Sequence, residues 1–405
     1  MFMVTVAVEL AIVYGMKYVC HTHLIDPGDI FICLPGGEPY VDAALAAGAS
    51  SWLAMDRVEL ASFGSAVYGH PSADLTVIGI TGTNGKTTVA HVLGHCLTAL
   101  GYRPAVQGTL TQSLTTPESI VTQHAMHTHR AAGGTHFIME VSSHGIDQHR
   151  VAGIQFACKL LTNVTQDHLD YHGDMETYHA IKYGFVSDDR GITPAMYLAE
   201  PLPCESPLIG PFNYENMQAV AAILRALSIS NDQIATVLPT AQAPPGRLER
   251  IDNDHGIDVI VDFAHTPDGL ARVLPLLRDR AIEQSGRLWV VFGCGGNRDR
   301  GKRPKMGAVA AQYADYIIVT QDNPRHESDS VITADILSGI PDTMTAVTVI
   351  TDRDQAIRTA IQQAQPSDVV VLAGKGHETT QLIGDEVRPF SDRDVALAAL
   401  RERQS

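Results

Sequence analysis

After Gly246 the sequence alternates short apolar runs with segments long enough to form helices. The apolar runs cover residues 259–263, 288–292, 316–320, 347–350 and 369–372. Parallel strands are buried on both faces and need a long crossover between them, so this alternation predicts an open, mostly parallel sheet with helices on both faces. We therefore expect an α/β, doubly wound Rossmann-like domain over residues 246–405.

Four of these runs end in segments rich in glycine, charge and amide groups. The segments are Asp262-Phe-Ala-His265, Gly293-Cys-Gly-Gly-Asn-Arg298, Asp322-Asn-Pro-Arg325 and Gly374-Lys-Gly-His-Glu378. In open parallel sheets, ligands bind beyond the carboxyl ends of the strands. The four segments therefore predict one composite binding site at that edge of the sheet.

A second strand–loop–helix unit lies between residues 75 and 100. The apolar run 75–80 leads into Gly79-Ile-Thr-Gly82-Thr-Asn-Gly85-Lys86-Thr87-Thr88, and apolar residues then recur at helical spacing from Val89. Backbone N–H groups of such a loop, the helix N-terminus and a lysine bind phosphate, and a threonine hydroxyl can ligate Mg²⁺. The strict GxxxxGK[ST] spacing is broken by Ile80. The strand–loop–helix context nevertheless predicts a nucleotide-phosphate site rather than a structural turn with a solvated lysine.

Several residues downstream of this loop are suited to anion or metal chemistry. Glu140 ends an apolar strand and is a candidate Mg²⁺ ligand, or else a hydrogen-bonded strand-end carboxylate. Arg150 could bind a carboxylate or phosphate with two parallel hydrogen bonds, although a surface ion pair has the same appearance in sequence. The segment 163–173 is dense in His and Asp, which fits either a metal site or local hydrogen bonding. Asp174 is suited to cap a helix that carries Lys182. A single lysine on a helix is usually exposed to solvent, so by itself Lys182 gives no sign of a functional role.

Composition excludes some classes of partner. With 29 Lys+Arg against 45 Asp+Glu, the formal net charge is −16, which argues against a nucleic-acid partner held by its phosphates. The six cysteines show neither metal-site nor disulfide spacing. Residues 1–16 are apolar but lack a basic region and contain Glu9, so they do not make a convincing export signal. No run is long enough to span a membrane, and we expect a cytoplasmic monomer.

The ordered motifs of the chain resemble those of the Mur ligases. They are TGTNGKTT, MEVSSHGIDQHR, TNVTQDHLDYHGDMETYHAIK, GPFNYEN, PGRLE, VDFAHTPD, VFGCGGNRDRGKRPKMG, DNPR and AGKGHE, between residues 76 and 392. Within the family they are most similar to the branch that adds meso-diaminopimelate to the D-glutamate of UDP-N-acetylmuramoyl-L-alanyl-D-glutamate. The resemblance implies an ATP- and Mg²⁺-dependent amide ligase of peptidoglycan precursor synthesis, which acts on small molecules through an acyl phosphate.

The resemblance also implies three domains and a set of site residues. The domains are a UDP-substrate domain at 1–72, a P-loop ATPase domain at 73–245 and an amino-acid-binding domain at 246–405. The implied catalytic residues are Lys86, Glu140, His168 and Lys182, and Mg²⁺ is implied at Thr87, Glu140, His168 and Lys182 as its carbamate. ATP is implied at Gly82, Thr83, Asn84, Gly85, Lys86, Thr87, Thr88, Asn216, Arg247 and Asp262. The muramoyl substrate is implied at Thr22, Thr115, Thr116, Ser142, Gln148 and Arg150, and diaminopimelate at Arg298, Asp322, Asn323, Arg325, Gly374 and Glu378.

Two departures from the family pattern keep other functions open. The chain has His21-Thr22-His23 where the family usually has Asp-Ser-Arg, and only the proline-rich stretch 186–207 stands where the family carries a long part of its central domain. We expect that stretch to be an irregular connection. A ligase for a different carboxylate acceptor and a non-catalytic homologue that binds the precursor are therefore alternatives. A GTPase is disfavoured because no guanine-reading NKxD segment is present.

Overall fold

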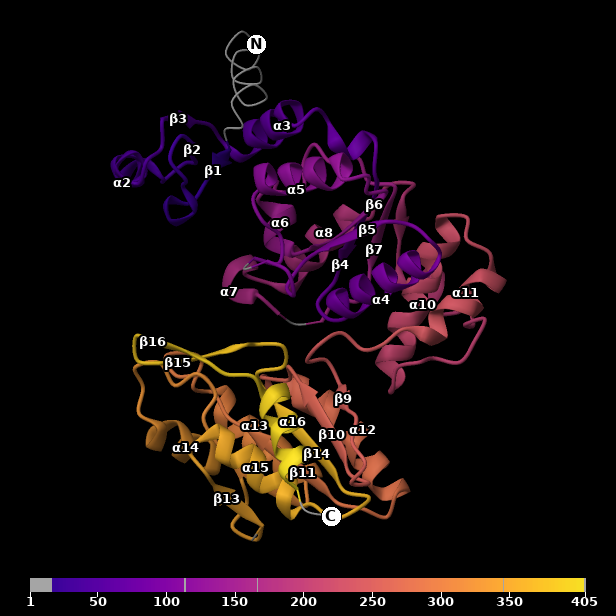
Figure 1. Cartoon of the computed structure of the whole chain (residues 1–405), viewed down its shortest axis with the longest axis vertical. Helices are drawn as coiled ribbons and strands as arrows, with labels where there is room; N and C mark the ends of the chain where they lie inside the picture. Colours follow the sequence, from indigo (N-terminus) through magenta and orange to yellow (C-terminus); the bar gives the residue numbers. More distant parts are fainter. Residues whose placement is uncertain (1–16, 113, 166, 345, 404–405) are drawn as a thin grey trace. The chain divides into compact units, whose positions relative to one another are not determined.

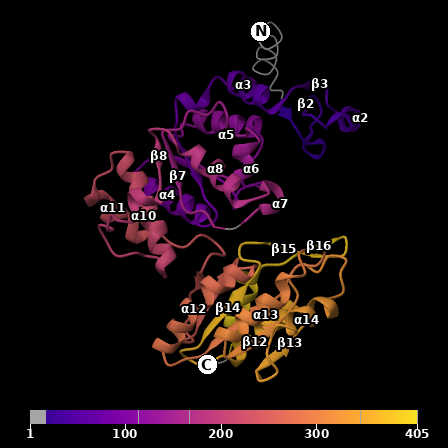
Figure 2. The same cartoon turned by 180° about the vertical axis from the view of Figure 1, so that it is seen from behind.

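The computed structural model describes residues 17–112, 114–165, 167–344 and 346–403 (Figures 1 and 2). The chain forms two compact units, Met1–Gln242 and Ala243–Ser405, here called unit 1 and unit 2. The apolar segment 1–16, which was weighed as an export signal, lies outside the described residues.

Unit 1 begins with a small module built on three parallel strands in the order β1-β2-β3. Its elements are β1 (Tyr18–Val19), the 3₁₀ turn η1 (Thr22–Leu24), β2 (Ile30–Cys33), η2 (Glu38–Tyr40), α2 (Val41–Ala46), β3 (Ser51–Ala54), α3 (Arg57–Val67) and η3 (Pro71–Ala73). Asp56 caps α3 and forms a reciprocal capping box with Glu59, which fixes where the helix starts. Leu60 and Phe63 of α3 share one core with Ile30 and with Ile120, so buried apolar contact joins the module to the rest of unit 1.

The rest of unit 1 is a parallel sheet in the order β5-β6-β4-β7-β8. Its strands are β4 (Thr76–Thr81), β5 (Pro104–Gln107), β6 (His136–Val141), β7 (Cys158–Leu161) and β8 (Gly191–Ile192). Its helices are α4 (Lys86–Ala99), α5 (Ser119–Ala131), α6 (Ser143–Asp147), α7 (Leu169–His172), α8 (Met175–Phe185), α9 (Pro194–Tyr197), α10 (Pro211–Ala226) and α11 (Asn231–Val237), followed by η4 (Leu238–Thr240). Helices α4 and α10 pack together on one face, while α5 and α8 contribute to the core on the other (Figure 1). The strand and helix predicted at 75–100 are confirmed as β4 and α4.

The expectation that 186–207 is irregular was wrong in its first half. Strand β8 pairs in parallel with β7, and Pro194 starts the one-turn helix α9. A two-residue strand and a four-residue helix are too short to leave a periodic signal, and the four prolines of this stretch concealed them.

Unit 2 confirms the predicted parallel sheet. Its order is β13-β12-β11-β14-β10-β9, and only β9 (Glu249–Ile251) runs antiparallel. The predicted runs correspond to β10 (Asp258–Asp262), β11 (Leu288–Phe292), β12 (Tyr316–Val319), β13 (Val347–Val349) and β14 (Val369–Ala373). Its helices are α12 (Pro267–Glu283), α13 (Lys302–Tyr313), α14 (Asp329–Leu337), α15 (Arg353–Gln363) and α16 (Asp392–Glu402). Helices α15 and α16 pack on one face, and α12 with α13 lies on the other (Figure 2).

The predicted runs did not include the short strand β9 or a hairpin near the C-terminus. A hairpin of β15 (Thr380–Ile383) and β16 (Glu386–Pro389) follows the last sheet strand. Strand β16 is exposed along its whole length and contains charge and proline, so it lacks the alternation that marks a half-buried strand.

The described residues bear on the expectations about membrane-spanning helices and about cysteines. None of the described helices combines the length and the apolar character needed to cross a bilayer. All six cysteines are free thiols.

A buried ion pair anchors the site edge of unit 2. Arg353 at the start of α15 and Asp392 at the start of α16 have fully buried side chains, and both guanidinium–carboxylate hydrogen bonds measure 2.7 Å. The same guanidinium donates to the carbonyl oxygens of Gln321 and Ala373, which follow β12 and end β14. Arg353 thus holds two strand ends that lead into the predicted binding segments.

We predict that Arg353→Met lowers the free energy of unfolding of unit 2 by about 3–5 kcal/mol, because it leaves Asp392 as an unpaired buried charge. The exposed pair Arg272–Asp268 supplies the control, and Arg272→Met should cost less than about 1 kcal/mol. Trp52 and Trp289 are the two tryptophans, so a Trp52→Phe background leaves the buried Trp289 to report unit 2 during urea unfolding. Equal losses for the two arginine variants would contradict the assignment.

Candidate functional site

The loop between β4 and α4 has the backbone shape of a phosphate cradle. Gly82 and Gly85 have φ values of 147° and 87°, a region that glycine adopts without strain. A Cβ atom on Gly82 would lie 1.8 Å from Thr162 Oγ1 at the end of β7, so only glycine fits there. Lys86 folds back over the loop and donates to the carbonyl oxygens of Gly82 at 2.8 Å and Thr83 at 3.1 Å. The loop therefore presents backbone N–H groups and a lysine at the N-terminus of a long helix.

Glu140 and Thr87 meet beside this loop. Glu140 is the penultimate residue of β6, which pairs with β4, and its side chain is buried. The Thr87 hydroxyl donates to Glu140 Oε2 at 2.9 Å, and Thr109 donates to Glu140 Oε1 through its backbone N–H at 3.0 Å. Hydroxyl and carboxylate oxygens are the hard ligands that Mg²⁺ takes when it also binds phosphate, so these two residues fit the metal. Sequence reasoning missed Thr109, although its place just after β5 on the same sheet edge was a signal.

Lys182 is buried at the same loop. Its Nζ donates to the Gly82 carbonyl oxygen at 2.9 Å and lies 5.0 Å from the centre of the Tyr178 ring. Burial, together with the nearby Lys86 ammonium, lowers the pKa of Lys182 to about 7. The interpretation of a solvated lysine on a helix surface is therefore wrong. Asp174 caps the helix that carries Lys182, as predicted, by accepting from Thr177 N–H at 2.8 Å.

His168 occupies an exposed position at the start of α7. Its backbone is left-handed with φ of 54°, and its Nε2 lies 3.3 Å from Asp167 Oδ2. Its ring is 5.0 Å from that of His144 and 6.4 Å from that of Tyr178, the residue that also contacts Lys182. Across the described parts of the chain, no group of three or more His, Cys, Asp or Glu side chains is arranged to hold a metal. Among the described residues, Thr87 and Glu140 remain the pair that fits Mg²⁺.

The structure brings most of the residues implied for the muramoyl substrate together next to Glu140. The buried Thr116 hydroxyl donates to the Glu140 carbonyl oxygen at 3.0 Å and accepts from Ser142 N–H at 2.8 Å. Arg150 donates to Thr116 O at 2.8 Å and to Gln148 Oε1 at 2.6 Å. Thr115 is the chain neighbour of Thr116, and Thr22 lies in η1 of the N-terminal module. Hydrogen bonds thus join Thr116 to Ser142 and Arg150, and Arg150 to Gln148, beside Glu140.

The residues implied for the rest of ATP lie in both units. Asn216 of α10 is buried against the loop, because a Cβ on Gly85 would come within 2.4 Å of its Oδ1. Asn84 and Thr83 are held to the end of β7 by Asn163 and by Thr165. In unit 2, the Arg247 guanidinium stacks 4.6 Å from the centre of the Phe263 ring. Asp262 is also in unit 2, where burial raises the pKa of its carboxyl although it accepts two backbone N–H bonds.

A second polar cluster lies at the strand ends of unit 2. Asn323 donates to Glu378 Oε2 at 3.0 Å, and the buried Lys375 donates to Glu378 Oε2 at 2.9 Å and to Asn323 Oδ1 at 3.2 Å. Burial opposes ionisation of Glu378, but Lys375 and Asn323 outweigh it and lower the pKa of this carboxyl. Lys375 was missed as a site residue, although it stands between two glycines in the quoted AGKGHE motif. This cluster holds a carboxylate in its charged form at the sheet edge.

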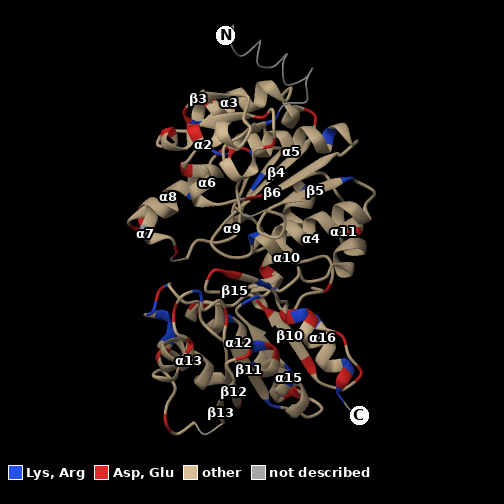
Figure 3. Cartoon of the chain, turned by 60° about the vertical axis from the view of Figure 1, so that its left-hand side comes forward, with Lys and Arg blue, Asp and Glu red and all other residues tan. Residues whose placement is uncertain are grey.

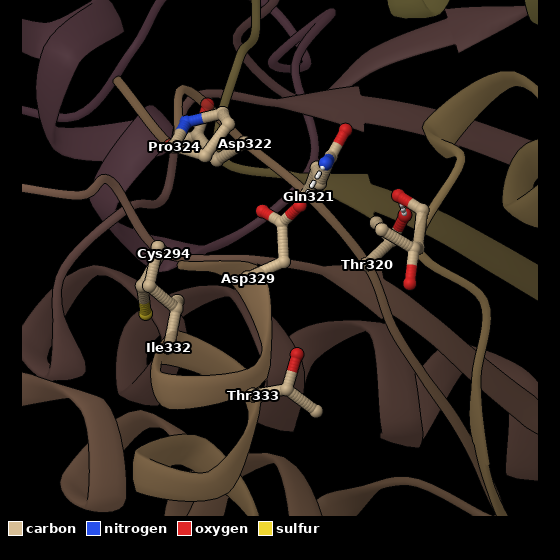
Figure 4. A pocket seen from close by; sticks show the side chains of 9 residues that line it. Cys294, Thr320, Gln321, Asp322, Pro324, Asp329, Ile332 and Thr333 are labelled. Carbon is tan, nitrogen blue, oxygen red and sulfur yellow. Dashed lines mark hydrogen bonds between the residues drawn. The ribbon is translucent and has the colours of Figure 1, made fainter. Parts of the chain in front are cut away.

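The other residues implied for the amino acid surround this cluster. Arg325, with a left-handed φ of 53°, donates to Gly296 O at 3.0 Å, and Gly374 N–H donates to Asp262 O at 3.0 Å. Arg298 is exposed. Asp322 and Pro324 line a small pocket together with Cys294 and Thr320, in which Gln321 reaches the carboxylate of Asp329 (Figure 4). Acidic and basic residues are interspersed along both units, so the cations at these sites are local features of an acidic chain (Figure 3).

Comparison with known proteins identifies the family. Residues 80–193 match the Mur ligase middle domain, and residues 246–376 match the Mur ligase glutamate ligase domain. A protein of Trichormus variabilis named UDP-N-acetylmuramoyl-L-alanyl-D-glutamate–2,6-diaminopimelate ligase is 38% identical, with 97% of this chain and 95% of that protein covered. The chain belongs to the Mur ligase family. A protein of the same name from Coxiella burnetii is also 38% identical, with 93% of this chain and 94% of that protein covered.

Solved structures agree with this assignment. A structure of a UDP-N-acetylmuramoyl-L-alanyl-D-glutamate–2,6-diaminopimelate ligase has a TM-score of 0.60 and 29% identity, with 95% of this chain and 94% of that chain covered. MurF of Thermotoga maritima in complex with ADP has a TM-score of 0.62 and 14% identity, with 96% of each chain covered, so it shares the Mur ligase fold. The alignment with the Trichormus protein runs over 476 positions, more than the 405 residues of this chain, so that Mur ligase carries segments absent here.

We predict that Gly82→Ala weakens binding of a non-hydrolysable ATP analogue by more than about tenfold, because its methyl group would displace the loop from Thr162. Gly101, just after α4, is a matched control, since its φ is also positive at 87° but no atom lies within 4 Å of a Cβ there. Gly101→Ala should cost about 1 kcal/mol of stability and leave nucleotide affinity intact. Calorimetric titration of both variants measures this, and an unchanged affinity in Gly82→Ala would show that the loop does not bind the phosphates.

Proposed function

We propose that this chain is the ATP-dependent ligase that adds meso-diaminopimelate to the D-glutamate of UDP-N-acetylmuramoyl-L-alanyl-D-glutamate. The observation that carries the proposal is the convergence of Lys86 and Lys182 on the Gly82 carbonyl oxygen, next to the Thr87–Glu140 pair. Relatives of that name match nearly the whole chain. With ATP as a substrate, the cytoplasm is the expected compartment, and we expect a monomer.

The chemistry explains why such a loop is needed. A carboxylate is a poor electrophile, so the γ-phosphoryl group of ATP is first transferred to the substrate carboxylate to form an acyl phosphate. The amine of the amino acid then attacks the carbonyl carbon, and the tetrahedral intermediate expels phosphate. Lys86 and the loop N–H groups stabilise the charge on the transferring phosphoryl group, since such transfers are catalysed mainly by positioning and electrostatics. Thr87 and Glu140, with His168 and a carbamate on Lys182, would hold Mg²⁺, which would supply additional positive charge near the phosphate oxygens.

The burial of Lys182 supports the proposed carbamate. The carbamate forms when a neutral amine attacks CO₂: the N–C bond forms, one C=O electron pair moves to oxygen, and the amine proton goes to solvent. A pKa of about 7 leaves a large fraction of Lys182 neutral at neutral pH, whereas an ordinary lysine is almost wholly protonated. The product is a carboxylate-like group, which replaces a cation by an additional metal ligand.

The charges of the unit 2 cluster suit diaminopimelate. Glu378 is kept ionised by Lys375 and Asn323, and a carboxylate there can accept from an ammonium group of the amino acid. Arg325 and Arg298, whose side chains both approach Gly295, supply guanidinium groups for the distal carboxylate. Free L-lysine lacks the distal carboxylate, so Arg325 would have no carboxylate of the amino acid to pair with.

We predict that the purified protein with ATP, Mg²⁺, the UDP-muramoyl dipeptide and meso-diaminopimelate releases phosphate well above its rate without the amino acid. Replacing diaminopimelate by L-lysine should lower kcat/KM by more than about a hundredfold, since a site built to bind a charged group rejects an analogue lacking it. Phosphate release that does not depend on the amino acid would sink the proposal. Micromolar binding of the dipeptide without turnover would instead favour a non-catalytic homologue, and turnover only with another carboxylate would favour a different acceptor.

We further predict that Lys182→Ala reduces kcat by at least about a hundredfold and that a short carboxylic acid partly restores it, because the acid supplies the missing carboxylate near the metal. Lys159, half-buried on unit 1 and paired with Asp188, provides the control. Lys159→Ala should retain wild-type turnover and should not respond to the acid. A fully active Lys182→Ala enzyme would refute the carbamate role.

A further inference from the structure

Glu118 is a buried carboxylate that no step described so far uses. It immediately follows Thr115-Thr116-Pro117 and forms the N-cap of α5, and only 4% of its surface is exposed. Two arginines meet it. Arg57 of the N-terminal module donates to both carboxylate oxygens, at 3.3 Å and 3.2 Å, and Arg150 Nε lies 3.2 Å from Oε1.

The contacts of Arg150 define its orientation. Its Nε lies 3.2 Å from Glu118 Oε1 without a hydrogen bond, its Nη1 donates to the Thr116 carbonyl oxygen, and its Nη2 donates to Gln148. A guanidinium is planar, so the hydrogen bond at Nη1 together with the ion pair to Glu118 orients the whole group. Gln148 is only half-buried and also donates to Tyr171, so it is the contact that an incoming anion can replace most easily. Glu118 and the Thr116 carbonyl thus hold the inner side of Arg150.

Charge balance gives Glu118 a second effect. Arg57 and Arg150 approach the same oxygen atom, Glu118 Oε1, and the two side chains are 34% and 14% exposed. Two guanidinium groups this close would repel each other in a partly desolvated site without a carboxylate between them. With Glu118 present, the three groups carry one net positive charge, which suits one anionic group of a ligand.

Arg57 extends this network into the N-terminal module. It is the first residue of α3, whose Leu60 and Phe63 belong to the core that contains β1, β2 and Ile120. Ile120 lies two residues after Glu118 in α5. A change in how the module packs therefore acts on Glu118 from two sides, through the Arg57 ion pair and through the shared core.

We propose that Glu118 is a positioning residue for the muramoyl substrate. It orients the Arg150 guanidinium toward an anionic group of that substrate, and through Arg57 it links this orientation to the packing of the N-terminal module. The inference rests on the proposed function, because it takes Arg150 as a substrate-binding residue. Glu118 does not touch the reacting atoms, so its effect should appear in the affinity for one substrate.

The test is steady-state kinetics of the full chain with each substrate varied in turn. Glu118→Gln should raise KM for the UDP-muramoyl dipeptide by about tenfold, with kcat within about twofold and KM for ATP and for diaminopimelate unchanged. Arg57→Gln, at a partly exposed position that is safer for folding, should raise the same KM by about threefold. The matched control is Asp74→Asn, because Asp74 pairs with Arg130 of the same helix at an exposed position, and it should change no KM.

A double-mutant cycle separates positioning from a structural role. In an Arg150→Lys background, Glu118→Gln should have little further effect on KM for the dipeptide, because Glu118 acts through the arginine that has been removed. Additive effects would overturn the inference, as would a Glu118→Gln or Arg57→Gln enzyme that melts earlier but keeps the wild-type KM. A wild-type protein without ligase activity would overturn the proposed function instead, so the two failures are distinguishable.

Discussion

The site of unit 1 is organised around one backbone group, the carbonyl oxygen of Gly82. It accepts hydrogen bonds from both Lys86 and Lys182, which come from helices on opposite faces of the sheet. The carbonyl is accessible because Gly82 adopts a φ of 147° and has no Cβ to collide with Thr162. Two lysines on one acceptor raise the local positive potential, and burial makes the cost of a second charge large enough to depress the pKa of Lys182.

Strand order supplies the acidic side of the same site. Because β4 lies between β6 and β7, its loop is flanked by Glu140 on one side and by Thr162 and Asn163 on the other. The threonine hydroxyls of Thr87 and Thr109 satisfy the buried Glu140 carboxylate, which would otherwise be a costly unpaired charge. The lysines that contact the loop after β4 therefore lie close to a carboxylate from the neighbouring strand β6, an arrangement suited to binding a metal–nucleotide complex.

Unit 2 uses buried charges in a different way. Arg353 and Asp392 form a fully buried pair that fixes two strand ends, and Lys375 holds Asn323 and Glu378 at the same edge. These cations are buried and paired with carboxylates, so they organise the strand ends rather than add positive charge to the surface of a chain whose net charge is −16.

The sequence by itself determined the parallel sheet of unit 2, the strand–loop–helix at Lys86, and the motifs that mark the Mur ligase family, because buried strands and glycine loops depend on local residue types. It could not distinguish a solvated Lys182 from a buried one, or a surface Arg150 from one held by Glu118, since those states depend on residues far away in the chain. Short elements such as β8 and the exposed hairpin β15–β16 also left no periodic signal. Only the tertiary structure decided these points, because burial and pairing are properties of the neighbours that folding brings together.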